Sequence, residues 1–367
     1  MVRYSAPLLL SCLCLSLLLG SSESQPRWYS NHKHYYYRGS RATHLGFPRG
    51  SQVRRSYWQN DVGLIMTASG AAATLPYRTA VVDQSGHGDF KTVQSAIDSV
   101  PSNNTNWVSI QINAGTYREK VVIPKEKPFI ILKGRGRRRT KIVWDDHTSI
   151  ECPTFMSLAD NIIVKGLGFV NSYNYGGSSD NELLPAVAAE VSGDKTSFYG
   201  CGFSGVQDTL WDNAGRHYFK RCTIEGAVDF IFGNAQSIYE ECAIRVVKGG
   251  FITAQARETA DSPSGFVFKG CTVSGVGLSY LGRPWRPYAR VLFFKSNFSQ
   301  VVDPRGWDPW NLSDQNGVIY AEYGNFGPGA DTSNRVSWEK KLSVDVWEKM
   351  TSMSFINEDG WLERQPY

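Results

Sequence analysis

The sequence lacks several features that would place it in common classes of protein. Beyond its first 24 residues it has no run of about 18 consecutive apolar residues, so no membrane-spanning helix is expected. It has no Cys-X-X-Cys or His-X-X-X-His pairing, which argues against a zinc site. It also has no Gly-X-Ser-X-Gly segment, and its six histidines are scattered, so a Ser-His-Asp hydrolase is poorly supported.

The N-terminus has the features of a secretory signal. Arg3 precedes an apolar run from Pro7 to Leu19, and the small-residue segment Ser22-Glu23-Ser24 follows. We therefore predict a cleaved signal over residues 1–24 and a secreted, extracellular product. Three Asn-X-Ser/Thr sequons become usable glycosylation sites in that pathway, at Asn103, Asn297 and Asn311.

Residues 25–78 differ in composition from the rest of the chain. They are rich in Tyr, Ser, Arg and Gly and show no sustained helical or alternating apolar period. Against the single acid Asp61 stand eight bases, Arg27, Lys33, Arg38, Arg41, Arg49, Arg54, Arg55 and Arg78. We predict a mobile, basic extension here, followed by one folded domain over residues 79–367.

Cysteine is scarce, and its number is odd once the signal is removed. Cys12 and Cys14 lie in the signal, and the remaining five are Cys152, Cys201, Cys222, Cys242 and Cys271. An oxidising compartment then permits at most two disulfides and one free thiol. The spacing allows a Cys201–Cys222 or a Cys222–Cys242 bridge, and it equally allows a buried column of free thiols.

Four of these cysteines mark an internal repeat. The segments Phe-Tyr-Gly-Cys, Phe-Lys-Arg-Cys, Tyr-Glu-Glu-Cys and Phe-Lys-Gly-Cys end at Cys201, Cys222, Cys242 and Cys271, and a candidate fifth copy ends at Asn297. The intervals are 21, 20, 29 and 26 residues, a period typical of stacked repeats. If each interval is one coil of a β-solenoid, equivalent residues lie one strand spacing apart, about 5 Å.

Short strand-like runs, separated by Gly, Asn and Asp, precede the repeats. They span residues 80–82, 108–112, 120–123, 129–132, 141–144, 162–164 and 169–171. An amphipathic helix capped by Asp89 and stopped by Pro101 is predicted to cover the open end of the solenoid. A second helix, around Trp338, Leu342, Val346 and Trp347, is predicted to close the chain.

Two carboxylates occupy equivalent positions in the repeat. Asp208 lies seven residues after Cys201, and Asp229 lies seven residues after Cys222, so the two are predicted to be stacked neighbours on one face. Two carboxyl groups that close do not both ionise easily, so one pKa should rise while the other stays low. An acid beside a carboxylate suits a hydrolase, although stacked structural aspartates have the same spacing.

Four segments of the chain, in order, resemble the signature blocks of plant pectinesterases. They are Gly-Thr-Tyr-Arg-Glu (115–119), Gln-Asp-Thr-Leu (207–210), Asp-Phe-Ile-Phe-Gly (229–233) and Leu-Gly-Arg-Pro-Trp (281–285). The resemblance runs from about Thr79 to the C-terminus and is to the form without a helical inhibitor-like pro-domain. It implies a right-handed parallel β-helix with short capping helices, and hydrolysis of the methyl esters of cell-wall polygalacturonate to pectate and methanol.

The resemblance also implies roles for five residues. Asp208 matches the family's general acid and base, and Asp229 matches its nucleophile. Arg283 would hold Asp229 ionised through a bidentate pair, and Gln207 would donate a hydrogen bond to the developing oxyanion. Trp285 would pack against a sugar ring. No metal or organic cofactor is implied, because the carboxylate pair supplies both the nucleophile and the proton transfer.

The expected partners follow from charge and from the resemblance. The net charge of +5 and the pI of about 8.7 favour an acidic polymer, and the secretory signal favours a cell-wall polyuronate over nucleic acid. The resemblance implies pectin as substrate and a proteinaceous pectinesterase inhibitor as a partner. We expect a monomer in the cell wall, with neither nucleic acid nor membrane as a partner.

One position departs from the family pattern. The family commonly has a glutamine in a Gln-Ala-Val-Ala block before Gln207, and here that position is Pro185, which has no side-chain donor. Loss of one oxyanion donor typically costs about 2.7–4 kcal/mol. The alternative hypothesis is therefore a catalytically weakened, pectin-binding wall protein. An inverting polygalacturonase and a calcium-dependent pectate lyase are other solenoid enzymes, but the four segments match neither.

Overall fold

A computed structural model describes residues 78–175 and 183–366 of the chain. The predicted signal over residues 1–24 lies outside the described residues, as does the predicted basic extension except for Arg78, which begins the first strand. No helix in the described ranges is long and apolar enough to cross a membrane.

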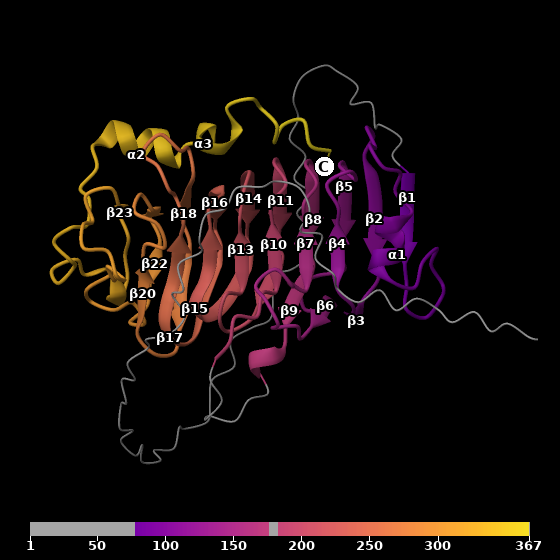
Figure 1. The fold of residues 1–367 in the computed structure, drawn as a ribbon, viewed down its shortest axis with the longest axis horizontal. Helices are drawn as coiled ribbons and strands as arrows, with labels where there is room; N and C mark the ends of the chain where they lie inside the picture. Colours follow the sequence, from indigo (N-terminus) through magenta and orange to yellow (C-terminus); the bar gives the residue numbers. More distant parts are fainter. Residues whose placement is uncertain (1–77, 176–182, 367) are drawn as a thin grey trace, which may run out of the picture. The chain divides into compact units, whose positions relative to one another are not determined.

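The described chain winds as a parallel β-helix (Figure 1). A ten-stranded sheet forms its first face, and a thirteen-stranded sheet forms the second and third faces. The long strands β15 (Thr223–Gly233) and β17 (Ala243–Gln255) join the second and third faces because each continues round the corner between them. All pairings between the named strands are parallel, and the prediction of a right-handed parallel β-helix is confirmed.

Successive coils contribute the ten strands of the first face, and most of them also contribute a strand to the second and third faces. The first face consists of β1 (Arg78–Val82), β2 (Val108–Ile112), β5 (Ile130–Lys133), β8 (Ile162–Lys165), β11 (Thr196–Tyr199), β14 (Arg216–Lys220), β16 (Gln236–Glu240), β18 (Gly265–Lys269), β21 (Arg290–Phe294) and β23 (Ile319–Tyr323). The second face contains β3 (Gly115–Arg118), β6 (Thr140–Trp144), β9 (Gly168–Asn171), β12 (Gly202–Ser204), β19 (Thr272–Gly275) and β22 (Asn297–Phe298). The third contains β4 (Val121–Ile123), β7 (Phe155–Ser157), β10 (Ala189–Val191), β13 (Leu210–Asp212) and β20 (Ser279–Gly282). The predicted strands therefore exist with ends shifted by at most two residues, whereas β3, β7 and β10 were missed.

The cysteine repeat follows from the way each coil turns from the first face to the second. Its aromatic residues are buried and stack on one another between coils. The stack contains Phe198, Phe219, Tyr239 and Phe268, with adjacent ring centroids 5.0, 4.6 and 4.6 Å apart. Two residues later the backbone is left-handed, with φ of 61° at Gly200 and 54° at Arg221. Glycine adopts this turn without the steric cost that an arginine must bear.

The cysteines that follow this turn are buried and carry free thiols. Cys201, Cys222, Cys242 and Cys271 form no disulfide, so the column of thiols is the alternative that the structure adopts. The candidate fifth copy was misplaced by one residue. Asn297 pairs with Thr272, which follows Cys271, so Ser296 and not Asn297 occupies the cysteine position.

The N-terminal helix covers the first coils, as predicted, but its cap is different. Helix α1 (Val93–Asp98) buries Val93, Ala96 and Ile97 in the core. Thr92, not Asp89, is its N-cap, and its side chain accepts a hydrogen bond from Ser95 N–H. Asp89 instead accepts from Val81 N–H at 2.8 Å. Glu119 of the Gly-Thr-Tyr-Arg-Glu block accepts from Val93 and Gln94 N–H, so this block closes the helix onto the solenoid.

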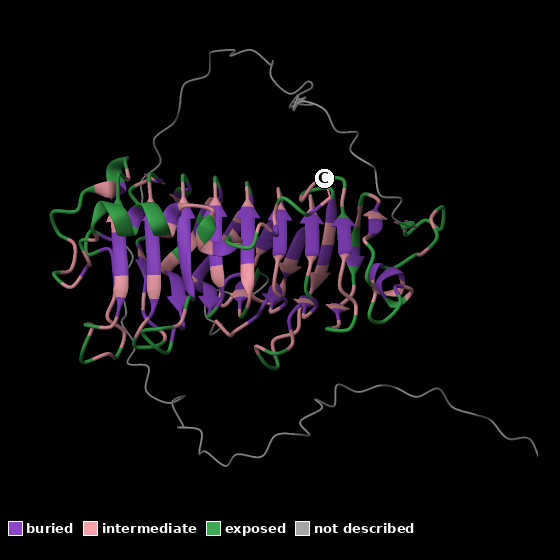
Figure 2. Cartoon of the chain, turned by 90° about the horizontal axis from the view of Figure 1, so that it is seen from above, coloured by how far each residue is buried: buried purple, intermediate pink, exposed green. Residues whose placement is uncertain are grey.

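The C-terminal helices lie along the side of the solenoid, which corrects the prediction of a closing helix. Helices α2 (Val344–Thr351) and α3 (Ser354–Asn357) cover the outer side of the first face (Figures 1 and 2). Trp347 and Ile356 pack there against an apolar strip of strand residues, which are Tyr218, Ile238, Val267, Leu292 and Ala321. This strip would otherwise face water, and its burial accounts for the placement of the helices. Trp338 precedes α2 and packs near Tyr320, with ring centroids 6.0 Å apart.

Candidate active site

Two aspartates occupy the corner between the second and third faces. Their backbones are left-handed, with φ of 58° at Asp208 and 49° at Asp229. Such conformations cost about 1–3 kcal/mol at non-glycine residues and persist where the surroundings enforce them. Gln207 forms a parallel bridge with Val228, and Asp208 N–H donates to the Val228 carbonyl at 3.0 Å. The aspartates therefore lie at equivalent positions on adjacent coils, as the repeat predicted.

The corner is tied together by one further hydrogen bond and one close approach. Thr209 Oγ1, on the Asp208 coil, donates to the Glu225 carbonyl of the next coil at 3.1 Å. A Cβ at Gly226 would come within 2.9 Å of the same Oγ1 and within 2.3 Å of Phe230 Cβ. Only glycine fits between these groups, and the two corners can therefore pack one directly on the other.

Burial and mutual repulsion act differently on the two carboxyl groups. Burial raises the pKa of Asp208 well above its usual range, the neighbouring Asp229 raises this pKa further, and Arg283 opposes both. Burial also raises the pKa of Asp229, which corrects the expectation that one pKa stays low, but its hydrogen bonds with Arg283 oppose that rise. As the pH increases, Asp229 therefore loses its proton first, and Asp208 remains the protonated partner.

Arg283 holds Asp229 in a bidentate ion pair. Its Nε lies 2.8 Å from Asp229 Oδ1, and its Nη2 lies 2.5 Å from Oδ2. The two side chains are only 14% and 10% exposed, so water competes weakly for these hydrogen bonds. The guanidinium is sandwiched between two rings, with Cζ 3.9 Å from the centroid of Phe251 and 3.8 Å from that of Trp310.

The Leu-Gly-Arg-Pro-Trp block places this arginine. Leu281 is fully buried, and Arg283 N–H donates to the Thr253 carbonyl at 2.9 Å. A Cβ at Gly282 would lie 2.0 Å from Thr253 Oγ1, so only glycine lets the two coils approach here. The close approach brings the Arg283 backbone to the same corner as Asp229, within reach of its carboxylate.

Trp285 belongs to a cluster of aromatic rings on the third face. Its centroid lies 6.0 Å from that of Phe232, and Phe232 stacks on Trp211 at 5.6 Å. Phe232 and Trp211 pair across β15 and β13, so the cluster lies just beyond the two aspartates along the chain. The half-buried rings of Trp211 and Trp285, beside the carboxylate pair, offer flat apolar surface on which a sugar can pack.

Gln207 and Pro185 lie on adjacent coils next to the pair. Gln207 directly precedes Asp208, and its carbonyl accepts from Ala186 N–H at 3.2 Å. Pro185 is half-buried and immediately precedes Ala186. Pro185, the residue that differs from the family pattern, therefore lies beside the corner that contains the two aspartates.

Sequence reasoning did not single out the two rings that hold Arg283. The only local signal for Trp310 is its place after Pro309 in a polar loop, and nothing local marks Phe251, which is one residue in a long strand. In the described part of the chain, no three His, Cys, Asp or Glu side chains gather closely enough to hold a metal ion.

A paired acid and carboxylate beside aromatic rings suits hydrolysis of a polysaccharide, so the fold and the site together define a carbohydrate-active hydrolase. The family model described as Pectinesterase matches residues 79–359, and the chain belongs to that family of carboxylic ester hydrolases, the pectin methylesterases. Four of the five residues with family-implied roles meet at one corner, and Trp285 lies in the adjoining aromatic cluster.

Named relatives and solved structures agree with this assignment. The chain is 54% identical over 298 residues to Probable pectinesterase 55 of Arabidopsis thaliana, covering 78% of this chain and 90% of the relative. It is 54% identical over 297 residues to Probable pectinesterase 29 of the same plant, covering 78% and 89%. Among solved structures, carrot pectin methylesterase matches with a TM-score of 0.73 at 31% identity, covering 82% of this chain and 99% of that one.

The Arg283–Asp229 pair makes a stability prediction with a defined pH dependence. Arg283→Met leaves a buried carboxylate without its cation, so the free energy of unfolding should fall by about 3–5 kcal/mol at neutral pH. Without the arginine, the pKa of Asp229 in the folded state rises further above its unfolded value. The free energy of unfolding of Arg283→Met therefore falls as the pH rises above the pKa of Asp229 in the unfolded chain, about 3.9. Its deficit relative to wild type should be smaller at about pH 4.5 than at about pH 7.5.

The control for this prediction is the double variant Arg283→Met/Asp229→Asn, measured by urea unfolding at both pH values. Because it contains neither member of the ion pair, it should be more stable than Arg283→Met alone at neutral pH. This advantage should be smaller at about pH 4.5, where less of the Asp229 carboxyl in Arg283→Met is ionised. A deficit that is the same at both pH values and is not relieved by Asp229→Asn would contradict the ion-pair account.

Proposed function

We propose that Asp229 is the nucleophile and Asp208 the acid and then the base in hydrolysis of pectin methyl esters. An Asp229 oxygen attacks the ester carbonyl carbon, and the tetrahedral intermediate expels the methoxy group. Asp208 gives its proton to the methoxy oxygen, so methanol leaves and an acyl-enzyme on Asp229 remains. The Asp208 carboxylate then takes a proton from water, and the hydroxyl attacks the acyl carbon. Asp229 leaves as a carboxylate, Asp208 keeps the proton taken from water, and the released uronic acid loses its own proton to solvent to become the uronate.

The bidentate pair between Arg283 and Asp229 is the observation that carries this proposal. It fixes both carboxylate oxygens and keeps the nucleophile charged, although burial alone would favour its protonated form. Asp208 has no such partner among the described residues, and its raised pKa leaves it protonated when the ester binds. The two identical side chains thereby acquire different roles.

The remaining assignments concern the oxyanion and the sugar. The Gln207 amide would donate a hydrogen bond to the oxygen that becomes negative in the tetrahedral intermediate. Trp285, in the aromatic cluster with Phe232 and Trp211, would pack against a sugar ring of the substrate. We further propose a secreted, glycosylated monomer that acts in the cell wall without a cofactor and has a proteinaceous inhibitor as a partner.

Substitution of the two aspartates tests the proposed roles. Asp229→Ala should reduce methanol release from highly methylated pectin by about a thousandfold or more, and Asp208→Asn should be nearly as damaging, because each removes a group that the reaction requires. Asp345→Ala, an exposed acid on α2, should keep wild-type activity. Circular dichroism of each variant checks that the solenoid is intact. Wild-type activity in both Asp229→Ala and Asp208→Asn would contradict the mechanism.

Pro185 separates the enzyme from the alternative of a weakened, pectin-binding wall protein. If the proline removes an oxyanion donor, Pro185→Gln should raise kcat by about tenfold or more, whereas Pro185→Ala should not. Equal kcat values for the two variants would mean that another group already supplies the donor. A wild-type protein that binds pectin but releases no methanol, and a Pro185→Gln variant that does, would instead establish the weakened form.

A further inference from the structure

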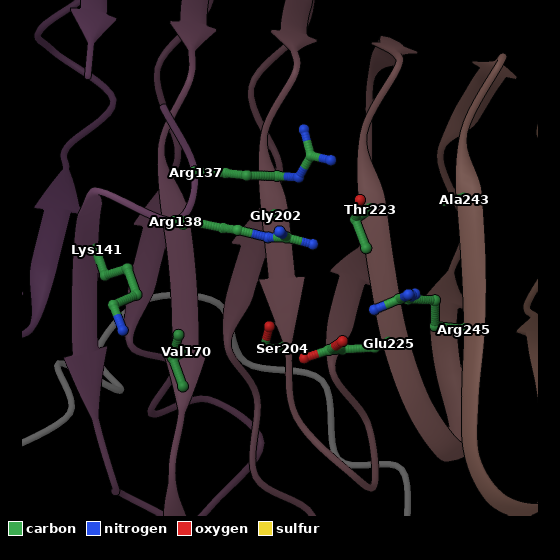
Figure 3. Close-up of a pocket in the computed structure, with 11 residues that line it drawn as sticks. Arg137, Arg138, Lys141, Val170, Gly202, Ser204, Thr223, Glu225, Ala243 and Arg245 are labelled. Carbon is green, nitrogen blue, oxygen red and sulfur yellow. The ribbon is translucent and has the colours of Figure 1, made fainter. Parts of the chain in front are cut away.

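The outer side of the second face carries a basic groove away from the carboxylate pair. It crosses strands β6, β9, β12, β15 and β17 and encloses a cavity of about 290 Å³. Four cationic side chains line it, and Figure 3 shows them reaching over the strands from both sides. They are Arg137, Arg138, Lys141 and Arg245. We use "basic groove" for these four residues together with Ser204, Thr223 and Glu225, which lie between them.

The groove exists because two successive strands present glycine where their neighbours present side chains. Gly168 pairs with Lys141, and Gly202 pairs with Thr223, so the two glycines continue one outward row. The turn before β6 folds over them. A Cβ at Gly168 would lie 2.4 Å from the Arg137 carbonyl oxygen, and one at Gly202 would lie 3.3 Å from Arg137 Cδ. Glycine at both positions therefore lets the Arg137 turn pack directly against the strands and forms the bottom of the groove.

The charge of the groove is unbalanced within the described residues. None of the four cations forms an ion pair with another described side chain. Glu225 is the one carboxylate among the described lining residues, and it accepts a hydrogen bond from Tyr175 OH at 3.3 Å. Figure 3 shows Arg138 and Arg245 extending from opposite sides toward the space above Ser204 and Glu225. Four converging cations with a single carboxylate among them are typical of a site for an anionic ligand.

We propose that the basic groove binds a demethylated stretch of polyuronate, a chain of sugar carboxylates, as a second polymer site. The choice of ligand rests on the proposed function, because removal of methyl esters creates such anionic stretches in the substrate. Lys141 and Arg245 lie on strands separated by four strand spacings, or roughly 19 Å at about 4.8 Å per spacing, so the groove can contact several carboxylates in a row.

The lining favours an acidic sugar over other polyanions. Ser204 and Thr223 offer hydroxyl groups, and Glu225 can accept hydrogen bonds from sugar hydroxyls, whereas its charge would repel a dense phosphate backbone. Among the described residues that line the groove there is no aromatic ring on which a nucleic-acid base could stack. Guanidinium groups, by contrast, match the planar geometry of carboxylates.

The groove is also suitably placed to act together with the carboxylate pair. Ser204 and Glu225 lie on the same two coils as Asp208 and Asp229, four residues earlier on each. A polymer segment held in the groove would keep the enzyme beside stretches that it has already demethylated. Binding there should therefore increase retention on partly demethylated polymer without changing the chemistry on a short ester.

Binding of a fully demethylated oligogalacturonate tests this proposal. The variant is Arg138→Gln/Arg245→Gln, in which both changed side chains are exposed and outside the core. The matched control is Lys125→Gln/Lys349→Gln, which loses the same charge at exposed positions elsewhere. Calorimetry at one fixed salt concentration should show a Kd about tenfold or more higher for the groove variant, because two charge-assisted contacts are lost. The Kd of the control should stay within about twofold of wild type.

Two further measurements separate this proposal from the proposed function. Methanol release from a short methylated oligomer should be the same for the groove variant and wild type. If wild type released no methanol, the proposed function would be contradicted but the groove proposal would not, because the binding comparison does not depend on turnover. Equal Kd values for the groove variant and its control would overturn the groove proposal. It would also be overturned if the groove variant lost affinity for a fully methylated oligomer to the same degree, because recognition would then not depend on carboxylate charge.

Discussion

In-register stacking of parallel coils is the constraint on which the rest of this structure depends. Because each residue lies one strand spacing from its counterpart in the next coil, any side chain that recurs in the sequence becomes a contact in space. The aromatic stack through Phe219 and the buried column of thiols both arise in this way. The same rule brings Asp208 and Asp229 together, although burial and repulsion make their proximity unfavourable.

The site uses that unfavourable proximity to give two identical side chains different states. Both aspartates have left-handed backbone, which is sterically unfavourable for a non-glycine residue. Close approach of the coils requires glycine at positions 226 and 282, and two rings enclose the Arg283 guanidinium. Together they hold a cation against one carboxylate only. The energetic asymmetry between Asp208 and Asp229 therefore comes from Arg283, which lies three coils beyond Asp208 in the sequence, and not from any local difference between the aspartates.

Much of the fold and of the carboxylate pair could be predicted, because both depend on periodicity. The strand at Val108–Ile112 and the spacing of Asp208 and Asp229 are visible in the sequence alone. The path of the C-terminal helices was not predictable, since it depends on an apolar strip that forms only when strands from five coils align. His217 shows the same limit. In the sequence it is one of several scattered histidines, whereas in the structure it is buried with Nδ1 2.5 Å from Asp212 Oδ1, a contact set by the interior of the solenoid.

The central claim is that Asp208 carries the proton and Asp229 the charge in the resting enzyme. Infrared difference spectroscopy at neutral pH tests it most directly, because a protonated carboxyl group and a carboxylate absorb at distinct frequencies. Wild type should show a protonated carboxyl band that disappears in Asp208→Asn and remains in Asp229→Asn. A band that disappears only in Asp229→Asn, or no protonated carboxyl band in wild type, would contradict the assignment of the two roles.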